Sequence, residues 1–184
     1  MLKRILLVPI IALFSFTSTA FSAENTLGFQ FRIPFQATAD KNVGNVNGQS
    51  TLLTFFLDQE TEVGVLNEVI NLRDKTPGGA GPVASYDVTA LRISKNVIIS
   101  GPAPVYVGMD VGNISVTSAA GVTLGASTMA DLFGGVRLLT SKGKVSSFLG
   151  IELGYRIAKP ALPAATVISS LGGTMLNLSV GLNF

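Results

Sequence analysis

The sequence predicts an all-β fold, an eight-stranded antiparallel up-and-down transmembrane β-barrel. Of its 184 residues, 47% are hydrophobic, yet beyond residue 22 no apolar run is long enough for a membrane-spanning helix. Apolar residues instead alternate with polar ones in short segments, as in strands that turn one face toward lipid. The connections between these segments alternate between long and short, which is typical of an up-and-down barrel.

Six segments show clear alternation, and we expect each to be a strand with one apolar and one polar face. They are residues 27–37, 52–58, 105–111, 131–138, 147–157 and 174–184. In the last of them, apolar residues recur at every second position up to Phe184.

Two further strands are expected at 62–73 and 84–94, where β-forming residues are frequent but the alternation loses phase. Val65-Leu66 and Val69-Ile70 place apolar residues on both faces, and a β-bulge would restore the register. The fifth strand has an alternative start at Val97. In that case residues 101–104 lie within the strand and do not precede it.

The connections predict which end of the barrel carries each loop. Long segments rich in small or polar residues are 39–48, 74–82, 116–127 and 159–172, and short ones are 59–61, 100–104 and 141–146. In an up-and-down barrel the short turns share one side of the membrane with both termini, and the long loops lie on the other side.

The first 22 residues read as a secretory signal peptide. Lys3 and Arg4 precede an apolar run at 5–16, and small residues follow at Ala20 and Ser22, so we expect cleavage near residue 22 and a barrel domain at 23–184. A membrane anchor is the weaker alternative, because this run is about half of the roughly 20 residues that a spanning helix needs. Removing the two leader cations from the 13 basic residues leaves 11 against 11 acidic ones, which gives no reason to expect a nucleic-acid partner.

The absence of cysteine and histidine removes disulfides, thiolate ligands, lipidated cysteine and the commonest general base. We therefore expect no enzymatic activity, no cofactor and no metal. Asp110 and Glu152 remain conceivable as an acid–base pair, but such carboxylates must flank a substrate cleft. The interior of an eight-stranded barrel is filled by side chains and offers none.

Charged residues on the polar strand faces predict a network inside the barrel. Asp131 and Arg156 lie at equal height on neighbouring strands, so we expect a direct cross-strand pair. Because unpaired buried charges are costly, we interpret the network as a plug of salt bridges, with an ion path or gated pore as the alternative. Its predicted members are Arg32, Asp110, Asp131, Arg137, Glu152 and Arg156.

The leader, the alternating strands and the terminal strand 174–184 together resemble the small eight-stranded bacterial outer-membrane proteins, which include the OmpX-like and OmpW-like barrels and the barrel domain of OmpA. The resemblance covers essentially the whole chain after the leader but matches no subfamily, and the lack of Trp implies thin aromatic girdles. In that group a C-terminal aromatic residue is read by the barrel assembly machinery, and Val180, Leu182 and Phe184 match this signal. The barrel enzymes of the group use a histidine that this chain lacks.

The resemblance implies an outer-membrane location in a Gram-negative bacterium, contact with outer-membrane lipid, periplasmic termini and surface-exposed loops. The first functional hypothesis is a structural or surface-interaction role, in which the loops contact an extracellular or envelope partner. The alternative is a porin-like narrow pore or an OmpW-like transporter of small molecules, hydrophobic ones included. A soluble periplasmic β-sandwich or pilus subunit is a third possibility.

Overall fold

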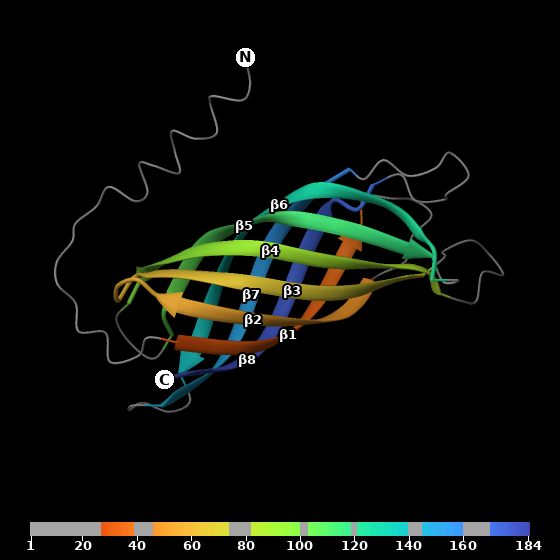
Figure 1. Cartoon of the computed structure of the whole chain (residues 1–184). Coiled ribbons are helices and arrows are strands. Elements are labelled where there is room, and N and C mark those ends of the chain that lie inside the picture. Colours follow the sequence, from red (N-terminus) through yellow and green to blue (C-terminus); the bar gives the residue numbers. More distant parts are fainter. Residues whose placement is uncertain are drawn as a thin grey trace, which may run out of the picture.

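The computed structural model describes residues 27–38, 46–73, 82–99, 103–118, 121–139, 145–159 and 170–184. These residues form eight strands, and the predicted signal peptide at 1–22 lies outside them (Figure 1). No helix among the described residues is long and apolar enough to span a bilayer. The strands are β1 (Leu27–Thr38), β2 (Val46–Phe56), β3 (Thr61–Arg73), β4 (Pro82–Ile98), β5 (Val105–Ser118), β6 (Thr123–Leu139), β7 (Ser146–Ala158) and β8 (Gly173–Asn183).

Each strand pairs antiparallel with its neighbours in sequence, and β8 pairs with β1 to close the barrel. The predicted fold class is therefore confirmed. The end that carries Leu27 and Phe184 is called the terminal end below, and the opposite end is called the loop end.

The strands are strongly staggered. A path that starts at Gly28 and follows paired residues around the barrel returns to β1 at Thr38, ten residues nearer the loop end. Such a stagger corresponds to a strand tilt of about 40° and to an interior that side chains fill. The path passes through Thr54, Gly64, Arg92, Asp110, Asp131, Arg156 and Gly173.

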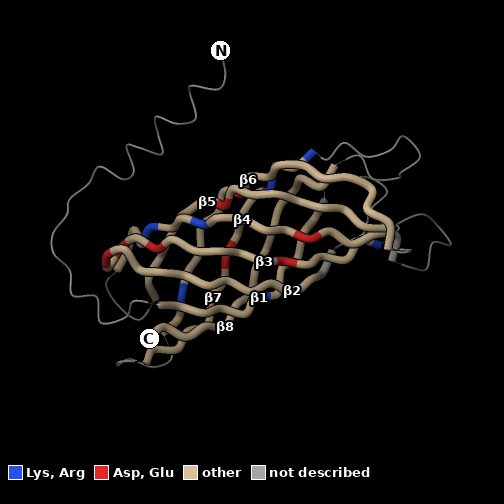
Figure 2. Tube along the Cα trace, in the orientation of Figure 1, with Lys and Arg blue, Asp and Glu red and all other residues tan. Residues whose placement is uncertain are grey.

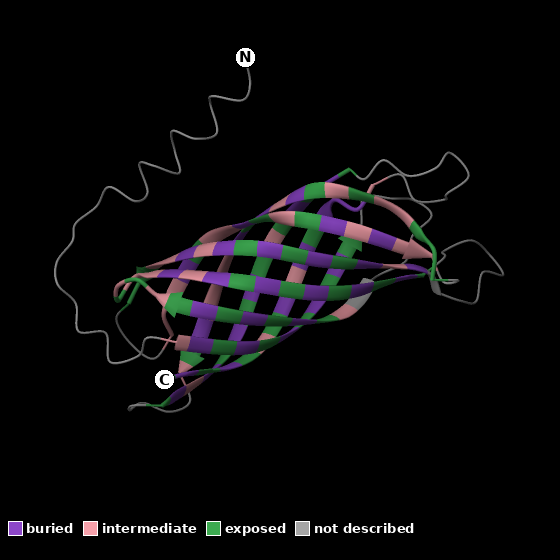
Figure 3. Cartoon of the chain, in the orientation of Figure 1, coloured by how far each residue is buried: buried purple, intermediate pink, exposed green. Residues whose placement is uncertain are grey.

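Alternation places apolar residues outside and polar residues inside along β1. Phe29 and Phe35 point outward and are exposed, whereas Gln30, Arg32 and Gln36 are buried in the interior. The same alternation gives the banded burial pattern that Figure 3 shows across the barrel wall. This is the arrangement expected when lipid surrounds a barrel and polar groups fill its interior.

The predicted bulge in the third and fourth strands is wrong. Pairing between β3 and β4 continues without a shift from Thr61 to Leu72, and irregularities occur only at Leu72/Arg73 and at Asn96/Ile98, close to strand ends. Val65 and Val69 point outward, while Leu66 and Ile70 are fully buried inside. Apolar residues therefore occur on both faces of a regular strand, because the inward ones join buried apolar side chains in the interior.

Leu66 and Ile70 belong to a group of buried side chains that we call the inner apolar cluster. Most of its members lie on the parts of β3, β4 and β5 nearer the loop end, so polar residues fill only part of the interior. The members are Leu52, Leu66, Ile70, Leu72, Ala84, Tyr86, Val88, Ala90, Ile114, Val116, Met129, Ala158 and Leu171.

The predicted long loop at 116–127 is also wrong. β5 extends to Ser118 and β6 begins at Thr123. The Ser118 N–H donates to the Val122 carbonyl at 2.8 Å, and Gly121 adopts φ +79°, which glycine tolerates without steric cost. The small residues up to Ser118 and from Thr123 onward resemble a loop in composition, but they form strand.

Two other boundaries differ less from expectation. β2 begins at Val46, inside the predicted loop 39–48. The alternative start of the fifth strand at Val97 is wrong, because β4 continues to Ile98 and β5 begins at Val105.

Candidate functional site in the barrel interior

Nine charged side chains are buried among the described residues, and they form the candidate site. Figure 2 shows acidic and basic residues spread along the strands that carry them. All six predicted network residues are among the nine, and each is at most 5% exposed. The nine are Arg32, Arg92, Arg137 and Arg156 together with Glu62, Glu68, Asp110, Asp131 and Glu152.

Glu152 on β7 is the hub of the first group of contacts. Its two carboxylate oxygens form ion pairs with Arg32 on β1 and Arg92 on β4. Asn177 on β8 donates to Glu152 Oε1 at 2.8 Å, and the Tyr106 hydroxyl on β5 donates to Oε2 at 3.2 Å. One carboxylate thereby joins strands from opposite sides of the barrel.

Arg92 extends this group toward β5 and β6. Its Nη1 lies 3.5 Å from Asp110 Oδ2, and the two residues are direct cross-strand partners. Its guanidinium carbon lies 3.6 Å from the centre of the Phe133 ring, close enough for a cation–π interaction. Arg92 is thus held by two carboxylates and an aromatic ring.

Arg156 on β7 forms the second group, nearer the loop end. Its Nε donates to Asp131 Oδ1 at 2.9 Å and its Nη2 to Asp131 Oδ2 at 2.7 Å, which is the bidentate geometry of a strong pair. Its Nη1 lies 2.7 Å from Glu68 Oε1 and 3.3 Å from the Tyr86 hydroxyl. Asp131 and Arg156 are direct cross-strand partners, as their equal height in the sequence indicated.

Arg137 and Glu62 form the third group, nearer the terminal end. Arg137 Nη2 donates to Glu62 Oε2 at 2.9 Å, and Nη1 pairs with the other carboxylate oxygen. The Arg137 guanidinium carbon lies 4.4 Å from the Tyr106 ring centre and 5.2 Å from that of Phe148. The three groups together occupy successive levels of the interior.

Sequence reasoning missed Glu62, Glu68 and Arg92. The two glutamates lie on the inward face of β3, where the assumed bulge obscured the phase. Reading residues 62, 64, 66, 68 and 70 as one continuous face would have placed both of them inside. The inward position of Arg92 on β4 would then have been predictable as well, because Arg92 is the cross-strand partner of Gly64 on that same face.

The arrangement is suited to closing the interior. Each of the four buried arginines is paired with at least one of the five buried carboxylates, so none of these positive charges is left unpaired in the low-dielectric interior. Among the described residues no group of three or more His, Cys, Asp or Glu could hold a metal ion. Fold and interior together define a small eight-stranded barrel of the outer-membrane type.

Comparison with solved structures agrees with this class. The chain is similar to the outer membrane protein OprG from Pseudomonas aeruginosa, with 11% identity, a TM-score of 0.57, and coverage of 87% of this chain and 97% of that one. It is also similar to Neisserial surface protein A, with 12% identity, a TM-score of 0.51, and coverage of 88% and 96%. These likenesses confirm the predicted resemblance at the level of fold. No protein-family model and no curated protein matches the sequence.

Proposed function

We propose that the chain is a non-enzymatic outer-membrane barrel of a Gram-negative bacterium, closed by its buried charges, that presents its long loops to an extracellular or envelope partner. The observation that carries the proposal is the buried network around Glu152 and Arg156. Both side chains are at most 5% exposed, and their partners come from strands around the whole barrel. A path for hydrated ions would have to break these pairs.

The outer surface supports the membrane location. Outward side chains on β1, β7 and β8 are apolar over most of the strand length, including Phe31, Ile151 and Leu178. The strands have 11 to 17 residues, and a tilted membrane strand needs about 9–11. The barrel is therefore long enough to cross a bilayer.

Export and assembly complete the proposal. Residues 1–22 would direct the chain across the inner membrane and be removed. Val180, Leu182 and Phe184 point outward and are 41–53% exposed, so the assembly machinery could reach the proposed signal. Outer-membrane lipid would surround the folded barrel.

The proposed orientation is tested by epitope tags on intact cells. We expect an antibody to reach a tag inserted between residues 77 and 78, because that connection belongs to the loop end. A tag inserted between residues 142 and 143, at the terminal end, should react only after the outer membrane is permeabilised. In both variants the unboiled protein should migrate differently from the boiled protein on electrophoresis, which shows that the barrel has formed. The reverse labelling pattern would contradict the proposal.

A second candidate function, a lateral route for small hydrophobic molecules, is favoured by a break in the pairing between β1 and β2. Leu27 and Phe184 exchange two backbone hydrogen bonds, at 3.1 and 2.9 Å. Hydrogen bonding in an antiparallel pair alternates along the strand, so the backbone N–H and C=O groups of odd-numbered β1 residues point to β8 and those of even-numbered residues point to β2. Pro34 therefore faces β2 without an N–H to donate. Pairing between β1 and β2 stops at Arg32–Ser50 and resumes at Phe35–Asn47.

On the inside, the break lies beside apolar side chains. Continuing the register places Gly48 opposite Pro34, and a Cβ at Gly48 would lie only 2.8 Å from Ile70 Cγ1 of the inner apolar cluster. A hollow of about 300 Å³, lined by Gly48, Gln49, Val69 and Asn71, lies at the same place on the outer face. A small apolar molecule would need to separate only this segment of β1 and β2 to reach the cluster.

A disulfide across the break separates the two candidates. We expect the double variant Ile33→Cys/Gln49→Cys to bridge, because facing residues that do not share hydrogen bonds have Cα atoms about 4.5 Å apart. If the route exists, oxidation should lower entry of a small apolar dye into cells several-fold, and reduction should restore it. The matched control is Phe31→Cys/Thr51→Cys, which bridges a continuous part of the same seam. Equal dye entry in the oxidised and reduced forms of both variants would contradict the lateral route.

A further inference from the structure

A row of uncharged polar side chains crosses the outer face of the barrel. Its members are consecutive cross-strand partners and all are exposed, and we call them the amide–hydroxyl row. They are Thr51, Asn67, Thr89, Asn113 and Thr128. The next row toward the terminal end is entirely apolar and consists of Leu53, Val65, Leu91, Val111 and Ala130. The surface therefore changes from apolar to polar within one step along each strand.

The stagger of the strands fixes the height of the polar row. With ten residues of stagger over eight strands, a row climbs about 3 Å per strand toward the loop end. The row starts beside Phe31 on β1, so Thr51, Asn67 and Thr89 lie about 3, 6 and 9 Å above Phe31 along the barrel axis. At about 5 and 10 Å above Phe31, β1 itself presents the exposed apolar residues Ile33 and Phe35.

With the barrel axis along the bilayer normal, polar side chains of β2, β3 and β4 thus lie at the height of the apolar belt of β1. Exposing hydroxyl and amide groups to hydrocarbon is unfavourable unless hydrogen bonds satisfy them. One such bond exists within the row, from Thr89 Oγ1 to Asn67 Oδ1 at 3.3 Å. The remaining hydrogen-bonding capacity calls for a partner outside the barrel.

The chemistry of the row indicates what that partner is. Threonine hydroxyls and asparagine amides both donate and accept hydrogen bonds, so the row is complementary to itself. It contains no Lys or Arg to bind the phosphate of an anionic lipid. A twofold dimer brings the same patch of both subunits together, and an uncharged donor–acceptor surface suits such a contact.

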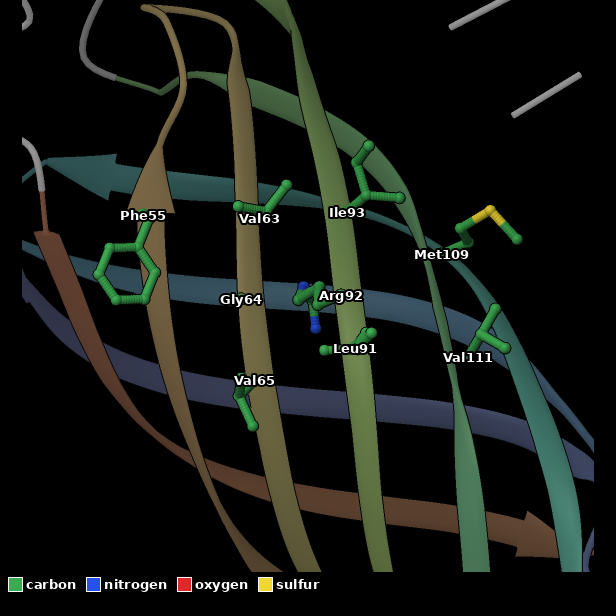
Figure 4. Close-up of a pocket in the computed structure, with 9 residues that line it drawn as sticks. All are labelled: Phe55, Val63, Gly64, Val65, Leu91, Arg92, Ile93, Met109 and Val111. Atoms are coloured by element: carbon green, nitrogen blue, oxygen red, sulfur yellow. The ribbon is translucent and has the colours of Figure 1, made fainter. Parts of the chain in front are cut away.

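A groove on the same strands provides room for packing. It has a volume of about 420 Å³ and lies directly on the terminal-end side of the row. Its lining includes Val65, Leu91 and Val111 of the apolar row, together with Phe55 and Met109 (Figure 4). A side chain from a facing barrel could fill this hollow while the polar side chains pair above it.

We propose that the outer face of β2–β5, formed by the amide–hydroxyl row and this groove, binds a second copy of the chain within the membrane. The twofold axis runs along the bilayer normal and passes close to Asn67 and Thr89, where the inclined rows of the two copies cross. This dimer rests on the proposed membrane location, but it is independent of whether the interior conducts.

Single cysteines test the dimer cleanly, because the native chain contains none. Thr89→Cys lies at the proposed contact, and the matched control Leu178→Cys lies on β8, four strands away in the closed order. In native membranes we expect a short bis-maleimide to cross-link Thr89→Cys into a dimer and to leave Leu178→Cys monomeric. Adding Asn67→Leu to Thr89→Cys should lower the yield about threefold to fivefold, as expected for one polar contact between membrane segments.

Three results would overturn the dimer. Rapid labelling of Thr89→Cys by a membrane-impermeant maleimide without cross-linking would place this face in water. Neither labelling nor cross-linking would mean that lipid covers it, and equal cross-linking of both variants would indicate random collision. If Leu178→Cys is also labelled rapidly by the impermeant reagent, the proposed membrane location fails as well, so the two failures can be told apart.

Discussion

Replacing Arg156 with methionine is expected to lower the free energy of unfolding by about 3–5 kcal/mol, the cost of breaking a buried ion pair by removing one partner. Methionine keeps much of the arginine volume, so packing changes little. It leaves Asp131 and Glu68 buried without the guanidinium that both contact at 2.7 Å. The measurement is reversible unfolding in urea of protein folded into lipid vesicles, followed by the electrophoretic shift on boiling.

The matched control for Arg156→Met is Lys95→Met. Lys95 pairs with Glu60 at 3.4 Å, but these side chains are 35% and 47% exposed, and exposed pairs contribute about 0–1 kcal/mol. We expect the control to unfold almost like the native protein. Equal losses in both variants would mean that the interior pairs do not hold the barrel together.

Replacing Glu152 with glutamine is expected to have an effect of similar size, again about 3–5 kcal/mol. The amide has nearly the same shape as the carboxylate, but it removes the charge that Arg32 and Arg92 share. Asp110 is left as the only carboxylate paired with Arg92 among the described residues, at 3.5 Å. The same urea measurement applies.

A double variant shows whether the loss comes from the proposed contact. Arg92→Met/Glu152→Gln removes both partners, so its loss should be about 1–3 kcal/mol smaller than the summed losses of the single variants. Strict additivity would show that Arg92 and Glu152 stabilise the barrel independently, contrary to the contact that the structure shows.

The sequence predicted those parts of the barrel where one face is apolar and the other polar. β1 and β8 follow strict alternation, so their ends and faces were predicted closely. β3 was not phased correctly in this way, because Leu66 and Ile70 face the inner apolar cluster while Val65 and Val69 face outward. Alternation carries no phase information where both sides of a strand are apolar.

Contacts in the interior were predictable only between neighbouring strands. The pair of Asp131 and Arg156 follows from equal height on β6 and β7 and appears in the structure. The ion pair of Arg32 with Glu152 joins β1 and β7, which are separated by β8, and it depends on a stagger that no local pattern reveals. The strand ends at Ser118 and Thr123 were misread for a related reason, since the contacts of Val116 and Leu124 with the cluster depend on the closed barrel.

If buried ion pairs close the interior, the barrel does not conduct ions, and single-channel recording in planar bilayers tests this most directly. The electrophoretic shift on boiling should first show that the protein is folded, so that an absence of conductance cannot be caused by unfolded protein. We expect the native barrel to give no reproducible conductance steps. Reproducible steps whose size changes when Glu152 or Arg156 is neutralised would show that ions pass along the charged interior and would contradict the account.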